Sequence, residues 1–203
     1  MKTNREKHWE KVYQTKSPEQ VSWTQTVPKT SLEFILSSGL SPKAKIIDVG
    51  GGDSNLVDFL LDKGFENITV LDISAKALEK AKRRLGKKAE KINWVVSDVL
   101  DFKPECCYDL WHDRATFHFL NEEQDVTQYM DIVRKAVGEY LVLATFSEEG
   151  PEKCSGLTVH RYSEEQLHSV LSNDFNKIRC VKEDHVTPSK SVQNFLFCSF
   201  RKN

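Results

Sequence analysis

The sequence predicts an α/β fold: a doubly wound, mostly parallel sheet of about seven strands with an antiparallel last strand and helices on both faces. Three observations support this fold class. Apolar strand-like segments alternate with amphipathic helix-like segments over most of the chain. The strand-like segments are mostly apolar, as in a parallel sheet that is covered on both faces. The last two extended segments are joined by a short loop, which favours an antiparallel hairpin at one edge.

The strands are expected where short apolar segments precede glycines or polar residues. The first five are expected over residues 44–50, 67–74, 92–99, 108–114 and 139–146. The closing hairpin is expected over residues 176–187 and 192–202, with its turn near 187–191. The parallel strands then alternate with helices, as a doubly wound sheet requires.

The helices are expected where apolar residues recur with helical spacing beside capping signals. A short helix over 30–38 begins with a capping box formed by Thr30 and Glu33. Further helices are expected over 54–64, 75–86, 125–138 and 163–171. We expect Asn121 to cap the helix over 125–138, and Ser163 with Gln166 to cap the last one.

Length and composition indicate one ordinary globular domain spanning residues 1–203, with its core from residue 45 onward. Apolar residues make up 39% and charged residues 29%, and the net charge is -1. This balance gives no general attraction to nucleic acid or to an anionic membrane. No apolar run approaches the length of a membrane span, and the charged amino terminus lacks a signal-peptide core, so we expect a cytoplasmic protein. The five cysteines, odd in number and irregularly spaced, argue against a disulfide framework and for a reducing cytosol.

The stretch DVGGGDS, residues 48–54, follows the first expected strand. Ligands of doubly wound sheets bind at the carboxyl ends of the strands. Gly50, Gly51 and Gly52 would form a turn at that edge, where glycine lets a ligand approach the backbone. Asp48 and Asp53 bracket the turn and would repel a pyrophosphate. A cationic or zwitterionic ligand, such as a sulfonium with a free amino group, fits this turn better.

Two further acidic residues end the next two expected strands. Asp72 ends the second strand, where a carboxylate can accept two hydrogen bonds from a ribose diol. Asp98 ends the third, where it can accept a hydrogen bond from an exocyclic adenine amine. The three strand ends together describe a site for an adenosine with a positively charged tail.

The order DVGGGDS, VLDIS, SDV and YDLWHDR resembles the class I S-adenosylmethionine-dependent methyltransferases, which have a Rossmann-like fold. The resemblance covers nearly the whole chain. It implies Asp48 and the three glycines beside the methionine part of S-adenosyl-L-methionine. It also implies Asp72, with Ile73 next to it, at the ribose, and Asp98 with Val99 at the adenine. One departure is Ser54, where many members have another glycine.

The stretch LWHDRATFHFL, residues 110–120, is unusually polar for the end of a strand, and the resemblance places it beside the transferred methyl group. His112 is the candidate base, because imidazole titrates near neutral pH. Arg114 would either orient an anionic group or pair with Asp113. His118 would either contact a ligand or lie in the core.

A narrower resemblance, through WHDRA, is to thiopurine methyltransferase-like enzymes. Such enzymes place a substrate loop where this chain has residues 150–167. Cys154, Arg161 and Tyr162 of that segment would either line the pocket or serve as ordinary loop and helix-entry residues.

The first thirty residues carry aromatic side chains ahead of the core. The stretch 8–23 resembles the lead-in of several small-molecule and protein-lysine methyltransferases, where it folds over the cofactor. Tyr13 and Trp23 would then offer cation–π attraction to a sulfonium and exclude water. The alternative is a helix that simply packs on the sheet. A basic run within residues 80–91 is expected to be a solvated helix face away from the cleft.

The sequence therefore predicts methyl transfer from S-adenosyl-L-methionine to a small-molecule acceptor, such as a thiol or an amine, by in-line displacement. The alternatives are a protein-lysine methyltransferase and a cofactor-binding module without turnover. A nicotinamide-dependent oxidoreductase is disfavoured, because Asn55 stands where the third glycine of its fingerprint belongs. No nucleic acid, membrane or metal partner is expected.

Overall fold

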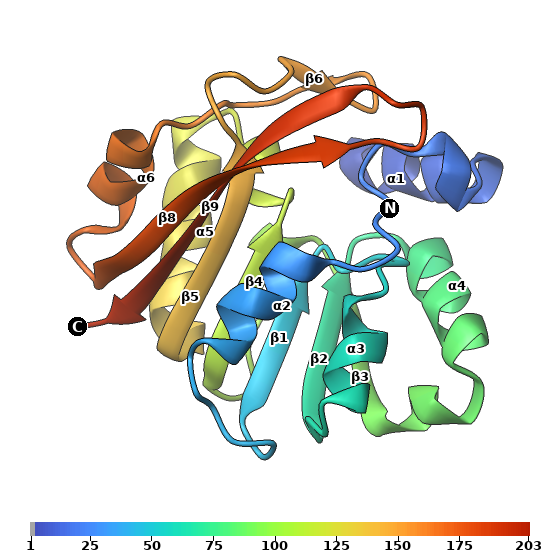
Figure 1. The fold of residues 1–203 in the computed structure, drawn as a ribbon, viewed down its shortest axis with the longest axis horizontal. Helices are drawn as coiled ribbons and strands as arrows, with labels where there is room; N and C mark the ends of the chain where they lie inside the picture. Colours follow the sequence, from blue (N-terminus) through green and yellow to red (C-terminus); the bar gives the residue numbers. More distant parts are fainter. Residues whose placement is uncertain (1–2) are drawn as a thin grey trace.

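The computed structural model describes residues 3–203 and contains a sheet of seven strands (Figure 1). These strands are β1 (Lys45–Val49), β2 (Asn67–Asp72), β3 (Ile92–Val96), β4 (Tyr108–Arg114), β5 (Val137–Phe146), β8 (Phe175–Val186) and β9 (Val192–Lys202). Their order across the sheet is β3-β2-β1-β4-β5-β9-β8. Strands β1 to β5 pair in parallel, whereas β9 is antiparallel to both β5 and β8. The predicted fold class is therefore confirmed.

The helices and remaining short elements connect these strands. The α-helices are α1 (Asn4–Thr15), α2 (Lys29–Leu36), α3 (Leu56–Asp62), α4 (Ala75–Leu85), α5 (Glu123–Ala136) and α6 (Glu164–Leu171). Short 3₁₀ helices are η1 (Pro18–Gln20), η2 (Gly86–Lys91), η3 (Val99–Asp101) and η4 (Phe117–Phe119). A small antiparallel pair, β6 (Lys153–Cys154) and β7 (Leu157–Thr158), lies in the loop after β5 and was not predicted.

The capping predictions are confirmed for one helix and wrong for two. At α6, Ser163 Oγ accepts from Gln166 N at 3.2 Å while Ser163 N donates to Gln166 Oε1 at 2.8 Å. At α2, Pro28 occupies the N-cap position, so Thr30 already lies inside the helix. At α5, Glu122 is the N-cap residue, because the amide of Asn121 donates instead to Phe119 O and Thr158 O.

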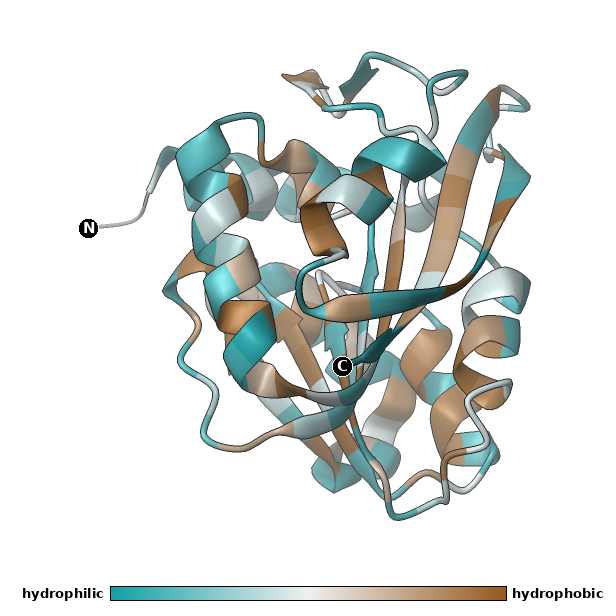
Figure 2. Cartoon of the chain, turned by 90° about the vertical axis from the view of Figure 1, so that its left-hand side faces the viewer, coloured by the Kyte–Doolittle hydropathy of each residue, from teal (hydrophilic) through white to brown (hydrophobic). Residues whose placement is uncertain are grey.

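The hydrophobic core lies on both faces of the sheet. Neighbouring residues of a strand point to opposite faces, so Ile47 packs in the cluster that includes residues of α5 and α6. Ile46 packs in the other cluster, with residues of α2, α3 and α4. Figure 2 shows hydrophobic residues concentrated in the strands and the helix faces turned to them. The two clusters hold the sheet rigid and fix the positions of the strand ends that form the site.

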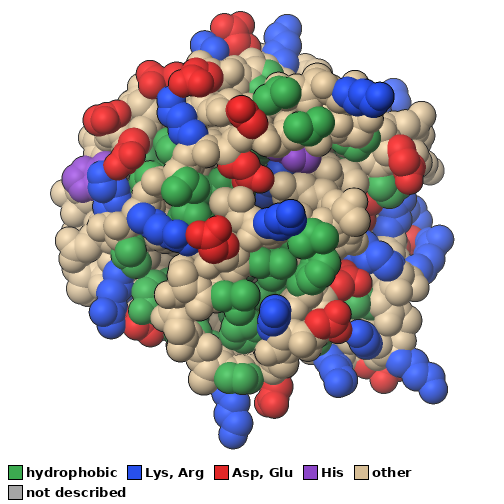
Figure 3. Space-filling model, viewed as in Figure 1, with side chains coloured by type: hydrophobic (Ala, Val, Ile, Leu, Met, Phe, Trp, Pro, Cys, Tyr) green, Lys and Arg blue, Asp and Glu red, His purple; other side chains and the backbone are tan. Residues whose placement is uncertain are grey.

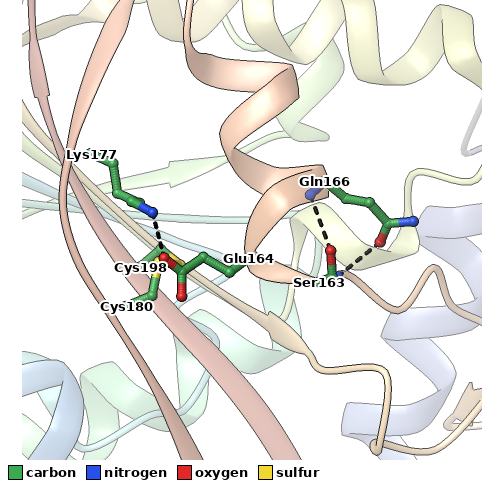
Figure 4. The surroundings of a disulfide bond; sticks show 6 residues. All are labelled: Ser163, Glu164, Gln166, Lys177, Cys180 and Cys198. Atoms are coloured by element: carbon green, nitrogen blue, oxygen red, sulfur yellow. Dashed lines mark hydrogen bonds and ion pairs between the residues drawn. A yellow bond between two sulfur atoms is a disulfide. The ribbon is translucent and has the colours of Figure 1, made fainter.

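A disulfide joins Cys180 of β8 to Cys198 of β9, residues that are paired in register with Cα atoms 4.1 Å apart (Figure 4). The expectation that the cysteines argue against disulfides is therefore wrong for this pair. The spacing of the two cysteines in the sequence gives no sign of it, because it depends on the register of the hairpin. Cys106, Cys107 and Cys154 are free thiols.

The surface carries charges of both signs. Figure 3 shows acidic and basic side chains interspersed with hydrophobic ones over the face that carries α2, without a region of one sign. Within residues 3–203, the helices are all too short or too polar to cross a lipid bilayer.

Candidate functional site

The carboxyl ends of β1, β2, β3, β4 and β5 surround one cavity of about 580 Å³, which residues of β9 and of the segment before β1 also line. Every predicted site residue except Gly52 lines it: Tyr13, Trp23, Asp48, Gly50, Gly51, Asp53, Asp72, Ile73, Asp98, Val99, His112 and Arg114. The rule that ligand sites of doubly wound sheets lie at the carboxyl edge thus locates this cavity from the sequence.

The glycine turn after β1 is shaped by neighbouring protein atoms. A Cβ on Gly50 would lie 1.8 Å from Thr116 Oγ1, and a Cβ on Gly52 would lie 2.5 Å from the Tyr13 hydroxyl oxygen. Both glycines have positive φ angles, 65° and 53°, which other residues rarely adopt. The interpretation that glycines here make room for a ligand is therefore incomplete, because Thr116 and Tyr13 already exclude a side chain.

Asp72, at the end of β2, is a buried carboxylate at the cavity wall. Its Oδ1 accepts from Ser74 N at 2.7 Å. None of the lysines and arginines among residues 3–203 forms an ion pair with it. Burial raises the pKa of Asp72 to about 7, and the carboxylates of Asp53 and Asp48 add to the rise. Burial likewise raises the pKa of Asp53.

Asp48, His112 and Ser31 form a buried hydrogen-bonded chain. His112 Nδ1 lies 2.7 Å from Asp48 Oδ1, and His112 Nε2 lies 3.0 Å from Ser31 Oγ. Because a carboxylate only accepts hydrogen bonds, Nδ1 donates to Asp48, and in the neutral imidazole Nε2 then accepts from the Ser31 hydroxyl. All three residues line the cavity. The imidazole therefore reaches the cavity with Ser31 as its hydrogen-bonded neighbour.

Asp98 follows β3 and already has protein partners. Its Oδ1 accepts from Leu100 N at 3.0 Å, which caps η3, and its Oδ2 lies 3.6 Å from Arg5 Nη1. Arg5 also pairs with Asp125 of α5. A ligand amine at Asp98 would share the carboxylate with these groups.

Arg114 does not pair with Asp113, the alternative that the sequence left open. Asp113 is fully buried; its Oδ1 accepts from Thr116 N at 2.9 Å and its Oδ2 accepts from the Tyr129 hydroxyl at 2.7 Å. Neighbours in a strand point to opposite faces, which separates the two side chains. Arg114 Nη1 instead donates to the Trp23 carbonyl at 3.1 Å.

Aromatic side chains from the first part of the chain form one wall of the cavity. Trp9, Tyr13 and Trp23 are in mutual ring contact, with centroids 5.7 to 6.5 Å apart. Trp9 also contacts Phe119 at 5.1 Å. Tyr13 is buried on α1, so the helix packs on the core and supplies the wall as well.

Other candidate residues divide between the cavity and the core. His118 does not line the cavity; its Nδ1 accepts from Phe146 N at 3.1 Å, and burial lowers its pKa to about 3. Of the loop residues, Cys154 lines the cavity. Arg161 donates to Glu148 O and Gly150 O instead. Tyr162 is likewise outside the cavity lining and stacks on Phe117.

The basic run in α4 is closer to the cavity than the sequence predicts. Lys80, Arg83 and Arg84 line its edge. Arg84 donates to Asp53 O and Ser54 O at 2.7 Å and pairs with Asp58. Its guanidinium therefore holds the segment after the glycine turn, a role beyond that of a solvated helix face.

Sequence reasoning missed several cavity residues. Ser31 lies inside α2, and Thr116 lies just after β4. Gln193 and Phe195 lie on β9, the strand paired with β5. The polarity around Thr116 was a usable signal, whereas nothing local marks Ser31 or the β9 residues, which reach the cavity only through tertiary packing.

The residues present fit S-adenosylmethionine. Asp72 is buried without a cationic partner among the described residues, and a ribose diol would donate to it. Asp48 and Asp53 lie at the glycine turn, where a sulfonium and an amino group would be attracted. The aromatic wall formed by Trp9, Tyr13 and Trp23 suits a cation.

The comparisons with known proteins agree with this geometry. Residues 46–138 match the family described as the methyltransferase domain. The mouse eEF1A lysine and N-terminal methyltransferase is 27% identical over 137 residues, which are 66% of this chain and 19% of that protein. Malonyl-(acyl-carrier protein) O-methyltransferase 2 of Ilyobacter polytropus is 29% identical over 105 residues, which are 51% of this chain and 40% of that protein. The chain thus corresponds to less than half the length of each of these relatives.

A solved structure shares the fold over most of both chains. The 1,6-didemethyltoxoflavin-N1-methyltransferase of Burkholderia thailandensis, solved with 1,6-didemethyltoxoflavin and S-adenosylhomocysteine, superposes with a TM-score of 0.67 at 16% identity. The match covers 95% of this chain and 81% of that chain. Residues 46–138 therefore form a methyltransferase domain, and the shared fold and the acidic strand ends around one cavity support a class I S-adenosylmethionine-dependent methyltransferase.

Proposed function

We propose that this protein transfers a methyl group from S-adenosylmethionine to a small-molecule acceptor. The observation that supports this most is the composition of the cavity. Its β1–β3 side is acidic, with Asp48, Asp53 and Asp72, and its β4–β9 side is aromatic, with Phe146 and Phe195 beside Arg114. One cavity of about 580 Å³ suits a cofactor with a small acceptor next to it.

The acidic side would hold the cofactor. Asp72 would accept hydrogen bonds from the ribose hydroxyls, and Asp98 with Val99 would lie at the adenine. Asp48 and Asp53, at the glycine turn, would attract the amino group and the sulfonium. When bound, the cofactor supplies an electrophilic methyl group, so the protein needs to align the acceptor and exclude water.

The chain of Asp48, His112 and Ser31 would take the proton of the acceptor. The Ser31 hydroxyl would receive the proton from the nucleophilic atom and pass its own to His112 Nε2 at 3.0 Å. Asp48, 2.7 Å from His112 Nδ1, would stabilise the resulting imidazolium. This path gives the acceptor proton a destination as the new bond to carbon forms.

The amino-terminal segment would close the site. Trp9, Tyr13 and Trp23 cover the cavity from α1 and from the loop before α2. Their rings would exclude water and offer cation–π attraction to the sulfonium. Residues 1–30 would in this way serve as a cofactor lid as well as a packed element.

A protein-lysine acceptor is the second candidate, favoured by the similarity to the mouse eEF1A lysine and N-terminal methyltransferase. The acidic residues that would attract a lysine on the loop after β5 are already paired in part. Glu149 pairs with Lys182, and Glu152 pairs with Arg161. This pairing reduces the negative charge open to a protein substrate and favours the small acceptor.

The proposal is tested by measuring S-adenosylhomocysteine formation with panels of thiols, amines and lysine-containing peptides. We expect turnover with members of the small-molecule panels and none in Asp72→Ala, which removes the ribose-binding carboxylate. Turnover with peptides alone would replace the small acceptor by a protein. Cofactor binding without turnover on any panel would leave a binding module.

A further inference from the structure

Arg114 lines the cavity, and two donor atoms of its guanidinium have no hydrogen-bond partner among the described residues. Its Nη1 donates to Trp23 O at 3.1 Å, and its Cζ lies 4.5 Å from the centroid of the Phe195 ring. Its Nε and Nη2 atoms are buried and have no hydrogen-bond partner among the described residues. Nε and Nη2 are adjacent donors on one edge of the planar group, the arrangement that binds a carboxylate with two parallel hydrogen bonds.

We propose that this edge of Arg114 binds a carboxylate of the methyl acceptor, so that the substrate is an apolar carboxylic acid carrying a nucleophilic thiol, amine or hydroxyl. The inference rests on the proposed function and specifies its substrate class. It assigns Arg114 to substrate binding, distinct from the proton path through Ser31 and His112.

No carboxylate of the described chain neutralises Arg114 by direct contact. Asp113 is bound by Thr116 and Tyr129, and Asp48 is bound by His112. Glu183 raises the pKa of Arg114 by its charge, but it forms no ion pair with the guanidinium among residues 3–203 and does not line the cavity.

Burial disfavours the charged form of Arg114 and lowers the pKa of its guanidinium to about 10. The side chain nevertheless remains a cation at neutral pH. The Trp23 carbonyl and the charge of Glu183 offset the cost of this burial in part, but the Nε and Nη2 donors remain without partners. A ligand anion that meets Nε and Nη2 would remove that cost.

The position of Arg114 places it on the acceptor side. It ends β4 and pairs in register with Ala144 of β5, and its guanidinium stacks on Phe195 of β9. Asp72 ends β2 and Asp98 follows β3, on the other side of β1 in the sheet order. The adenosine end and Arg114 therefore lie on opposite sides of the glycine turn.

The groups beside Arg114 suit an apolar body attached to the carboxylate. Phe119, Phe146 and Phe195 line the cavity, and the guanidinium of Arg114 contacts the ring of Phe195. Gln193 Oε1 is buried there without a partner and can accept a hydrogen bond from the ligand. A single guanidinium against an aromatic ring, in a cavity with further phenylalanines, favours a flat or apolar molecule with one anionic group.

The test uses benzoate and its neutral isostere benzamide as probes, titrated calorimetrically into wild-type protein saturated with S-adenosylhomocysteine. We expect benzoate to bind at least about tenfold more tightly than benzamide, since a charged bidentate pair is worth more than a neutral contact. Equal affinities, or no benzoate binding at about millimolar concentration, would overturn the proposal. This comparison needs no variant.

The same titrations on Arg114→Lys and Arg114→Met identify the residue. We expect the preference for benzoate to disappear in Arg114→Met and to fall to an intermediate value in Arg114→Lys, which keeps the charge and loses the two-donor edge. The matched control is Arg179→Lys. Arg179 also stacks on a ring, 4.1 Å from the centroid of Phe34, but pairs with Glu33 and lies outside the cavity lining. The preference of Arg179→Lys for benzoate over benzamide should equal that of wild type.

Affinity for S-adenosylhomocysteine separates this inference from the proposed function. We expect equal affinities in wild type, Arg114→Lys and Arg179→Lys. A loss of cofactor affinity in Arg114→Lys, with benzoate preference unchanged, would mean that Arg114 holds the carboxylate of the cofactor and would overturn the inference. Failure of wild type to bind S-adenosylhomocysteine would overturn the proposed function, and benzoate preference in the free protein would still report on Arg114.

Discussion

The two sides of the cavity differ in charge and in their origin along the chain. The β1–β3 side is formed by strand ends and the glycine turn; it carries the carboxylates of Asp48, Asp53 and Asp72, with Lys80, Arg83 and Arg84 at its edge. The β4–β9 side contains Arg114, which contacts Phe195 of β9, and it also includes Phe119 of η4 and Phe146 of β5. The first side suits a cation with hydroxyl groups, and the second suits an apolar molecule with an anion.

The comparison shows how one cavity can hold two unlike ligands in a fixed order. Carboxylates on one side and a guanidinium on the other give each ligand a preferred end. His112 lies between them on β4, paired in register with Asp48 of β1. The boundary between the two sides is therefore where methyl transfer would take place.

The largest effect is expected at this boundary. His112→Gln should lower turnover about 100-fold or more, the usual contribution of a proton-accepting group, while S-adenosylhomocysteine affinity stays the same. S-adenosylhomocysteine affinity measured on the same variant separates the loss of a proton acceptor from a structural change of the site, which would lower both turnover and affinity. The control is His168→Gln, an exposed residue of α6. Unchanged turnover in His112→Gln would remove the proton path.

The next effect concerns the acidic side alone. Asp72→Asn should weaken S-adenosylhomocysteine binding roughly 10- to 100-fold, because it removes the charge that strengthens the ribose hydrogen bonds. The affinity of wild type and variant for benzoate should be equal, since Asp72 is remote from Arg114 in the sheet order. If calorimetric titration shows that Asp72→Asn weakens the binding of S-adenosylhomocysteine and of benzoate to the same extent, the two sides of the cavity do not bind their ligands independently.

The same variant should be more stable than wild type at alkaline pH. The pKa of Asp72 is raised to about 7 by burial, so above pH 7 the folded protein carries a buried charge that the unfolded chain carries at no cost. Asp72→Asn removes this cost and should raise the Tm at pH 8 by about 3 °C or more. The gain should shrink as pH falls from 7 to about 4, the ordinary value for Asp. A lower Tm at pH 8 would contradict the account of Asp72.

Cofactor affinity should follow the titration of Asp72. Ribose hydroxyls donate to the ionised carboxylate, so protonation below pH 7 should weaken S-adenosylhomocysteine binding by up to about tenfold per pH unit. In Asp72→Asn this dependence should disappear. Calorimetric titrations between about pH 5.5 and 8.5, on both sides of the pKa of Asp72, measure this dependence. If affinity changes with pH equally in wild type and Asp72→Asn, another group is responsible for the titration.

The smallest effect tests the turn between the two sides. Gly52→Ala should lower the Tm by roughly 3 °C or more, because a Cβ would meet the Tyr13 hydroxyl at 2.5 Å in a backbone of positive φ. Adding Tyr13→Phe should restore part of the loss, since it removes the clashing oxygen. If the double variant is no more stable than Gly52→Ala, the clash with the Tyr13 hydroxyl does not explain the glycine. Gly52 would then be required for its backbone conformation or for ligand binding.

The acidic side could be predicted from the sequence and the acceptor side only in part. Asp48, Asp72 and Asp98 directly follow or end apolar strands, and parallel strands bring their carboxyl ends to one edge. Local sequence and one topological rule therefore suffice to place them. Arg114 was placed by the same rule, but its lack of a partner follows from the hydrogen bonds of Asp113, which only the folded structure shows.

The features that were missed depend on packing between distant segments. Ser31 reaches His112 from a helix 81 residues away in sequence. Phe195 and Gln193 reach the cavity because β9 inserts beside β5, and the disulfide between Cys180 and Cys198 depends on the register of β8 and β9. The two capping errors, at Thr30 and Asn121, arose where a proline or a loop contact takes over the local signal.

The most direct test of the account is a calorimetric titration of the wild-type protein with S-adenosylmethionine, S-adenosylhomocysteine and, as a control, NAD. We predict that the first two bind at one site per chain with micromolar affinity and that NAD does not bind, because the carboxylates of Asp48 and Asp53 repel a pyrophosphate. Binding of NAD in place of S-adenosylmethionine, or of none of the three, would contradict it.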